Sequence, residues 1–63
     1  MKALSEYMSD DGKRHAVIRL DDELIVIDYF ENGNIIKTES GIDITYRSAV
    51  DLAEDFVLHQ EHK

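Results

Sequence analysis

The stretch LIVIDYFENGNIIKTES, residues 24–40, decides the fold of this 63-residue chain. Two apolar runs flank Asn32-Gly33, a pair that favours a two-residue type I′ turn because both turn positions must tolerate positive φ. The runs are rich in β-branched and aromatic residues, which favours strands over residues 24–31 and 34–39. The sequence therefore predicts an antiparallel hairpin closed by Asn32-Gly33.

The same turn fixes a register for the two strands. With Asn32-Gly33 at its centre, Asp28 faces Lys37, and an acid opposite a base is a favourable cross-strand pair. Alternation along the strands then gathers an apolar set on one face, which we expect to be buried: Ile25, Ile27, Tyr29 and Ile36.

A further strand is expected over residues 13–20, where apolar and polar residues alternate. A two-residue turn at residues 21–22 would place Ile18 beside Ile25, on the same face as Tyr29. A three-residue loop would move the apolar set to the opposite, charged face. We therefore expect the shorter loop, or one of equivalent parity.

Residues 45–60 predict an amphipathic helix with Thr45 as its N-cap. Apolar residues recur there at helical spacing: Tyr46, Ala49, Val50, Ala53, Phe56 and Val57. Residues 1–9 also contain Leu4, Tyr7 and Met8 at helical spacing, which is consistent with either a short N-terminal helix or an arm.

Together these elements predict a single α+β domain, residues 1–63. Its fold is a three-stranded antiparallel β-meander with a C-terminal amphipathic helix packed on one face, with or without the short N-terminal helix.

The chain carries 14 acidic against 7 basic residues, a formal net charge of −7. Such charge keeps a small protein in solution and repels nucleic acid and anionic membranes, so we expect neither as a partner. No cysteine is present, which excludes a disulfide framework and a thiolate metal site. The longest apolar run has four residues, and the N-terminus lacks a signal-peptide apolar core, so the expected location is the cytoplasm.

No catalytic, metal or cofactor signature emerges. The register places His15 across from Asp28, in a row with Lys37 that reads as a surface charge ladder rather than an acid–base site. His59 and His62 lie three residues apart near the helix end, where a metal would need further ligands. No serine sits in a nucleophile-elbow motif, and three turn glycines cannot build a phosphate cradle. We therefore expect no enzyme.

The element order is similar to that of double-stranded-RNA-binding domains, which dock RNA with lysines at the start of the last helix. Here that helix begins Thr45-Tyr46-Arg47-Ser48 and carries acidic residues beyond it. The chemistry for RNA is absent, so shared topology does not carry that function across.

The face of the sheet opposite the helix retains apolar residues that the fold does not require. The candidates for an interface with a partner or a second copy are Val17, Leu24, Val26, Phe30 and Ile35. The alternative is that the N-terminal segment folds back over this face and covers it.

Three stretches of the chain resemble small uncharacterised proteins of tailed phages, notably those that infect marine cyanobacteria. These stretches are MKALSEYM at residues 1–8, YFENG at residues 29–33 and YRSAVDLAEDF at residues 46–56. The resemblance implies an accessory protein acting in the cytoplasm of an infected bacterium, and it implies no activity or site residues.

The leading functional hypothesis is a non-enzymatic protein-interaction module with an unknown protein partner. The alternatives are an obligate homodimer with a structural role, and an acidic nucleic-acid mimic that blocks a DNA- or RNA-binding protein of the host.

Overall fold

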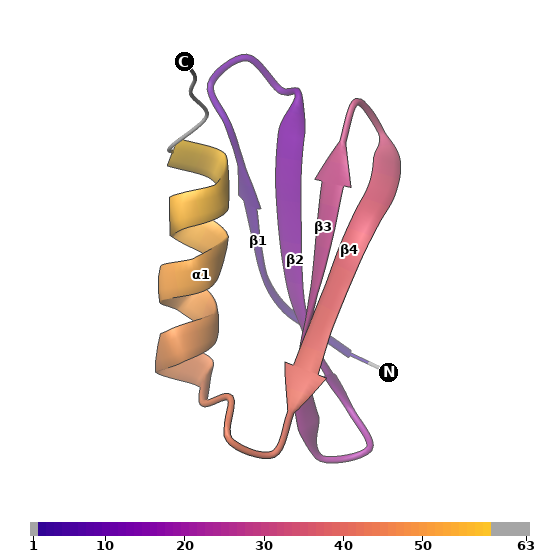
Figure 1. Cartoon of the computed structure of the whole chain (residues 1–63), viewed down its shortest axis with the longest axis vertical. Coiled ribbons are helices and arrows are strands. Elements are labelled where there is room, and N and C mark those ends of the chain that lie inside the picture. The colour runs from indigo at the N-terminus through magenta and orange to yellow at the C-terminus, as the bar shows by residue number, and fades with distance from the viewer. Residues whose placement is uncertain (1, 59–63) are drawn as a thin grey trace.

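The computed structural model describes residues 2–58 as one antiparallel sheet and one helix (Figure 1). The strands follow chain order across the sheet and the helix comes last: β1 Lys2–Met8, β2 Arg14–Asp21, β3 Leu24–Glu31, β4 Asn34–Gly41 and α1 Tyr46–Leu58. The predicted α+β class and the meander with a C-terminal helix are confirmed. The sheet has four strands rather than the predicted three.

The additional strand is β1, so the prediction of an N-terminal helix or arm is wrong. β1 pairs with β2, with Tyr7 opposite Ala16 and Ser5 opposite Ile18. Tyr7 packs against the core, and the Ser5 Oγ shares a hydrogen bond with the hydroxyl of Tyr46 in α1. So short a segment cannot nucleate a stable helix alone, whereas the edge of β2 offers it a ladder of backbone hydrogen bonds.

Both turns of the β2–β3–β4 meander use positive φ at two successive residues. Asn32 and Gly33 have φ of 54° and 83°, as the predicted turn requires. The first turn consists of residues 22–23, one position later than predicted, and both of its residues also have positive φ. Ile18 consequently lies opposite Ile27, two positions from the predicted partner but on the predicted face.

A β-bulge at Ile36 changes the register of the β3–β4 hairpin. The extra residue brings Lys37 opposite Tyr29, and Asp28 therefore faces Thr38. The predicted Asp28–Lys37 pair is wrong for this reason.

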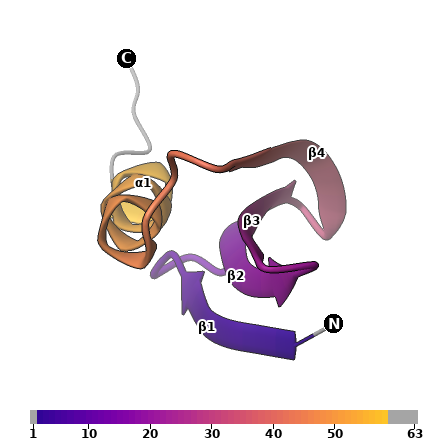
Figure 2. The same ribbon diagram turned by 90° about the horizontal axis from the view of Figure 1, so that it is seen from below.

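The core lies between α1 and one face of the sheet. Its buried side chains are Ala16, Ile18, Ile27, Tyr29, Ala49, Ala53 and Val57. The helix alanines allow α1 to approach the sheet closely. In Figure 1 and Figure 2, α1 lies at the β1 side of the sheet and β4 at the far side. The helix packs on β1, β2 and β3, so that β4 extends the sheet beyond it.

Thr45 caps α1 as predicted, because its Oγ1 accepts a hydrogen bond from the Ser48 amide at 3.1 Å. The structure describes α1 to Leu58, and residues 59–60 of the predicted helix lie outside the described residues. Over the described part of the chain, no helix has the length and apolarity needed to cross a membrane.

Candidate functional site

The five apolar residues of the predicted interface lie on the outer sheet face but differ greatly in exposure. Val26 is only 6% exposed, so the expectation that it is uncovered is wrong. Val17, Leu24 and Phe30 are half-buried, whereas Ile35 is 55% exposed. Of this set, the structure brings Phe30 and Ile35 together as a directly opposed pair on β3 and β4. Within the predicted set, Ile35 alone is exposed.

A polar network occupies the middle of the same face. The Arg19 Nε donates to Asp28 Oδ2 at 2.7 Å, its Nη2 donates to Oδ1 at 3.4 Å, and Thr38 Oγ1 donates to Oδ1 at 3.0 Å. The hydrogen bonds from Arg19 hold the pKa of the buried Asp28 carboxyl below its usual value, despite the opposing effect of burial. A carboxylate stabilised in its charged form is a weak base, so this network is structural.

His15 does not join that network, and the predicted row of His15, Asp28 and Lys37 does not form. His15 lies opposite Phe30, with ring centroids 5.6 Å apart, and its Nε2 is 3.7 Å from a carboxylate oxygen of Glu6. The bulge in β4 sends Lys37 to the other face of the sheet. The predicted residues His59 and His62 lie outside the described residues.

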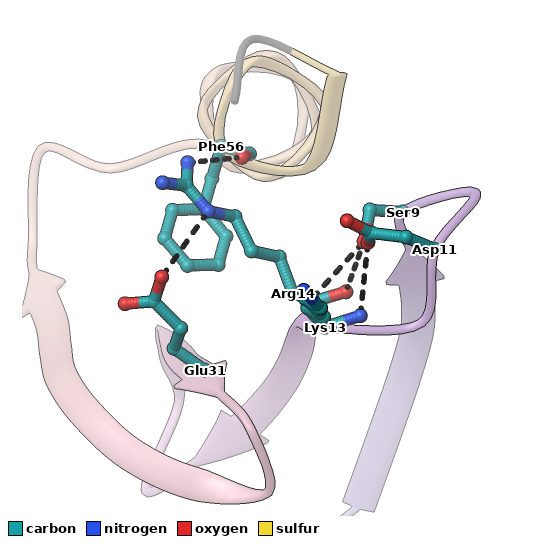
Figure 3. Close-up of polar contacts among 6 residues, drawn as sticks. All are labelled: Ser9, Asp11, Lys13, Arg14, Glu31 and Phe56. Carbon is teal, nitrogen blue, oxygen red and sulfur yellow. Dashed lines mark hydrogen bonds and ion pairs between the residues drawn. The ribbon is translucent and has the colours of Figure 1, made fainter. Parts of the chain in front are cut away.

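The β1–β2 loop is closed by its own side chains (Figure 3). Ser9 Oγ donates to Asp11 Oδ1 at 2.7 Å and accepts from the Arg14 amide at 3.0 Å. The Lys13 amide donates to the same Asp11 oxygen at 3.0 Å. The hydrogen bonds that Asp11 accepts lower its pKa, and the bond from Ser9 has the largest effect. Ser9 thus acts in this loop as a turn-forming group.

Arg14 joins the end of α1 to the sheet (Figure 3). Its Nη1 donates to the carbonyl oxygen of Phe56 at 3.2 Å, where a cation also complements the helix dipole. Its guanidinium carbon lies 5.1 Å from the centroid of the Phe56 ring, and its Nε is 3.7 Å from a Glu31 carboxylate oxygen. Phe56 in turn meets Tyr29 edge to face, with centroids 4.8 Å apart. Arg14 thereby positions the side chains between α1 and β3.

A groove of about 240 Å³ lies beside this contact, between α1 and β4. It is lined by Tyr29, Ile36, Lys37, Glu39, Leu52, Asp55 and Phe56. Ile36 and Leu52 are 53% and 41% exposed, which is high for aliphatic residues in a domain with so small a core. The groove exists because α1 covers the first three strands only. The β4 bulge directs the consecutive residues Ile36 and Lys37 to it.

The polar rim of the groove is ordered by Glu39. Tyr29 donates its hydroxyl hydrogen to Glu39 Oε1 at 2.7 Å, and Lys37 Nζ lies 3.5 Å from Glu39 Oε2. Lys37 Nζ also lies 5.3 Å from the Tyr29 ring centroid. Burial, assisted by Glu39, raises the pKa of the Tyr29 phenol far above its usual value, so Tyr29 acts as a neutral donor. With Asp55 included, the rim carries two carboxylates and one ammonium group.

Within residues 2–58, no group of three or more histidine, cysteine, aspartate or glutamate side chains could hold a metal ion. No protein-family model matches the chain, and searches of curated proteins and of solved structures give no match. The groove between α1 and β4 is therefore the candidate site on geometry alone.

The sequence indicated this site only indirectly. Leu52 stands at the edge of the apolar stripe of the helix, and an apolar residue at that position can pack or stay exposed. Ile36 was expected in the buried set because the predicted register placed it opposite Tyr29; it does lie on that face, but α1 does not extend over β4 to cover it. The position of β4 beyond the helix could not be predicted from the sequence. It depends on β1 being a strand, which was not predicted.

Proposed function

We propose that this chain is a non-enzymatic protein-interaction module, of the phage accessory type that the sequence resemblance implies. Its groove between α1 and β4 receives an apolar side chain from a basic segment of a partner protein. The observation that carries the proposal is the exposure of Ile36 and Leu52 on opposite walls of one groove.

The dimensions of the groove support a protein ligand. Its volume of about 240 Å³ lies below the roughly 300–1,000 Å³ of pockets that enclose small molecules and cofactors. It suits one or two side chains that project from a larger partner. The aromatic floor formed by Tyr29 and Phe56 provides a rigid contact surface of the kind found at interface hot spots.

Charge defines the chemistry of the partner. The carboxylates of Glu39 and Asp55 line the rim, and Lys37 Nζ lies 3.5 Å from Glu39 Oε2. The whole chain carries a net charge of −7, so a basic segment is drawn toward the molecule and an acidic one is repelled. A lysine or arginine that flanks the inserted apolar side chain therefore completes the contact.

The test uses short synthetic peptides and the amide resonances of the folded protein. A peptide of alternating lysine and leucine should shift the resonances of Ile36, Leu52 and Phe56. A peptide with serine in place of leucine has the same charge and should leave them unmoved. Equal shifts for both peptides, or shifts centred on another surface, would refute the proposal.

A pair of matched variants separates the groove from general charge. Leu52→Lys and Leu58→Lys each add one positive charge to α1, but only Leu52 lines the groove, and Leu58 is 67% exposed elsewhere on the helix. Leu52→Lys should abolish the peptide-induced shifts, whereas Leu58→Lys should retain them. If both variants lose the peptide to the same extent, the groove is not the binding site.

A further inference from the structure

The outer edge of β4 is an open sheet edge. β4 is the last strand of the sheet order, with β3 as its neighbour, and residues 2–58 supply no further strand to cover it. α1 does not pack on β4 either. The backbone groups on that side are available for pairing with another strand, and natural proteins usually block such edges.

β4 carries two such devices, a bulge in its first part and charged side chains in its regular part. The bulge lies at Ile36, and from Lys37 to Gly41 the strand pairs regularly with β3 and contains no proline. One charged pair, Lys37 and Glu39, lies two residues apart in this regular part and on the groove face. A regular strand of this length can accept one partner strand.

The charges along residues 37–39 can pair with those of a second copy of the same segment when a two-fold axis relates the two copies. When two copies of β4 pair in antiparallel fashion, the axis is perpendicular to the sheet, and each residue faces one on the same face. An axis through Thr38 places Lys37 opposite Glu39 of the second copy, and the reverse. An axis through Glu39 would instead oppose two carboxylates, and one through Lys37 would oppose two ammonium groups. The Thr38 register alone joins unlike charges.

We infer that β4 is a homodimerisation edge, at which two copies of this chain pair antiparallel about Thr38 into one continuous sheet. The Lys37–Glu39 pair within each chain spans 3.5 Å, with Lys37 59% and Glu39 34% exposed, so it is weak and easily exchanged for the intermolecular pairs. Because the two-fold axis is perpendicular to the sheet, both helices then lie on the same side of the joined sheet. The inference does not rest on the proposed function.

Charge reversal tests the register. Lys37→Glu and Glu39→Lys should each raise the dissociation constant of the dimer about tenfold, because each sets like charges against each other at two symmetric positions. The double variant K37E/E39K restores unlike pairs and should recover dimerisation. Each single reversal shifts the net charge by two, from −7 to −9 for K37E and to −5 for E39K. If affinity simply followed net charge, it would rise for E39K, which would overturn the inference.

Sedimentation equilibrium gives the readout. The wild-type protein should show a weight-average mass that rises above 7.3 kDa with concentration. A mass that stays at 7.3 kDa at every accessible concentration overturns the inference, whatever the peptides show at the groove. Far-ultraviolet circular dichroism establishes that each variant is folded.

A cross-linking pair decides the register even if Glu39→Lys fails to fold. The chain has no cysteine, so a single introduced thiol reports alone. Under the Thr38 axis, the thiols of two Thr38→Cys chains lie opposite each other, with Cα atoms about 5 Å apart, within disulfide range. Those of Ser40→Cys chains lie roughly 13 Å apart. With oxidised glutathione, T38C should form covalent dimers much faster than S40C, whose position is exposed as well, and equal rates overturn the inference.

Discussion

At the scale of the residue, Asp28 explains why the middle of the outer sheet face is filled rather than free. A carboxylate that is only 9% exposed is tolerated there because Arg19 and Thr38 both donate hydrogen bonds to it. Strand alternation placed Asp28 on this face from the sequence alone. The identity of its partners could not be deduced, because the bulge in β4 substitutes Thr38 for the expected lysine and the β2–β3 turn determines which residue approaches from β2.

Asp28→Ala should lower the free energy of unfolding by about 2 kcal/mol near neutral pH, because it removes the acceptor of three hydrogen bonds, two of them from a charged donor. Thr38→Val removes one of these bonds and should cost about 1 kcal/mol. Urea unfolding monitored by circular dichroism measures both.

The effect of Asp28→Ala should depend on pH in a defined direction. The pKa of Asp28 is lowered in the folded state, so its stabilising contribution is complete above the unfolded value of about 4. The contribution is lost as the pH falls through the folded value. The difference between wild type and variant should therefore be largest near neutral pH and shrink in strong acid. A difference that is the same at about pH 7 and about pH 2 would mean that the charge of Asp28 contributes nothing.

At the scale of the element, turn chemistry determines how much of the meander could be predicted. Asn32-Gly33 specified its hairpin because few other pairs accept two positive φ values. The turn at Asp22 and Glu23 has the same geometry, with φ of 54° and 67°, but its residues give no such signal. Face parity could still be predicted there, since an error of two positions in pairing leaves every side chain on its own face.

β1 could not be predicted from its own residues, because Leu4, Tyr7 and Met8 fit helical spacing while Ser5 and Tyr7 also fit alternation. The open edge of β2 decides between the two, and that edge is a property of the assembled sheet. Local propensity gives way to tertiary context in such a segment. The helix was more predictable, since its apolar stripe and its Thr45 cap are both local features.

Glu23→Gly should stabilise the protein by about 0.5–1 kcal/mol, because Glu23 has a φ of 67°, where a Cβ atom costs about 1–2 kcal/mol and glycine costs nothing. Part of that gain is offset by the greater freedom of glycine in the unfolded chain. Thermal unfolding at constant ionic strength measures the change.

Gly33→Ala is the converse control in the neighbouring turn, because it adds a Cβ atom at a positive φ instead of removing one. Gly33 has a φ of 83°, and a Cβ atom there would meet nothing within 4 Å, so any loss of stability arises from backbone strain alone. The loss should be about 1 kcal/mol. Equal effects of the same sign for E23G and G33A would show that φ does not govern these turns.

At the scale of the whole molecule, both proposed surfaces have one origin. A single helix of 13 residues covers three strands of a four-stranded sheet, and the fourth strand is left with an uncovered face and an open edge. The uncovered face of β4 forms the groove with Leu52, and the open edge offers the pairing site around Thr38. In a three-stranded sheet, as expected from the sequence, β4 would also be an edge strand, but the helix would be centred differently and the groove beside Leu52 would not form as it does here.

The net charge of −7 leads to a prediction about the whole molecule. The repulsion among the acidic groups destabilises the fold, whereas a few ion pairs stabilise it. Most of the pairs in the described residues have a partner at least one-third exposed, so each contributes little. Raising the salt concentration from about 0.01 M to about 0.15 M shortens the screening length from roughly 30 Å to roughly 8 Å and weakens the repulsion. The urea midpoint should therefore rise with salt, at protein concentrations low enough to keep the chain monomeric.

Glu54→Gln tests the cause of that salt effect. Glu54 lies on the exposed side of α1, and its replacement removes one negative charge without disturbing the core. The variant should be slightly more stable than wild type in low salt, by a few tenths of a kcal/mol, and its midpoint should rise less steeply with salt. A wild-type midpoint that falls as salt is added would instead mean that the ion pairs, led by the buried Arg19–Asp28 contact, outweigh the repulsion. In that case the acidic surface would not destabilise the fold, and its charge could be kept for attracting a basic partner at no cost in stability.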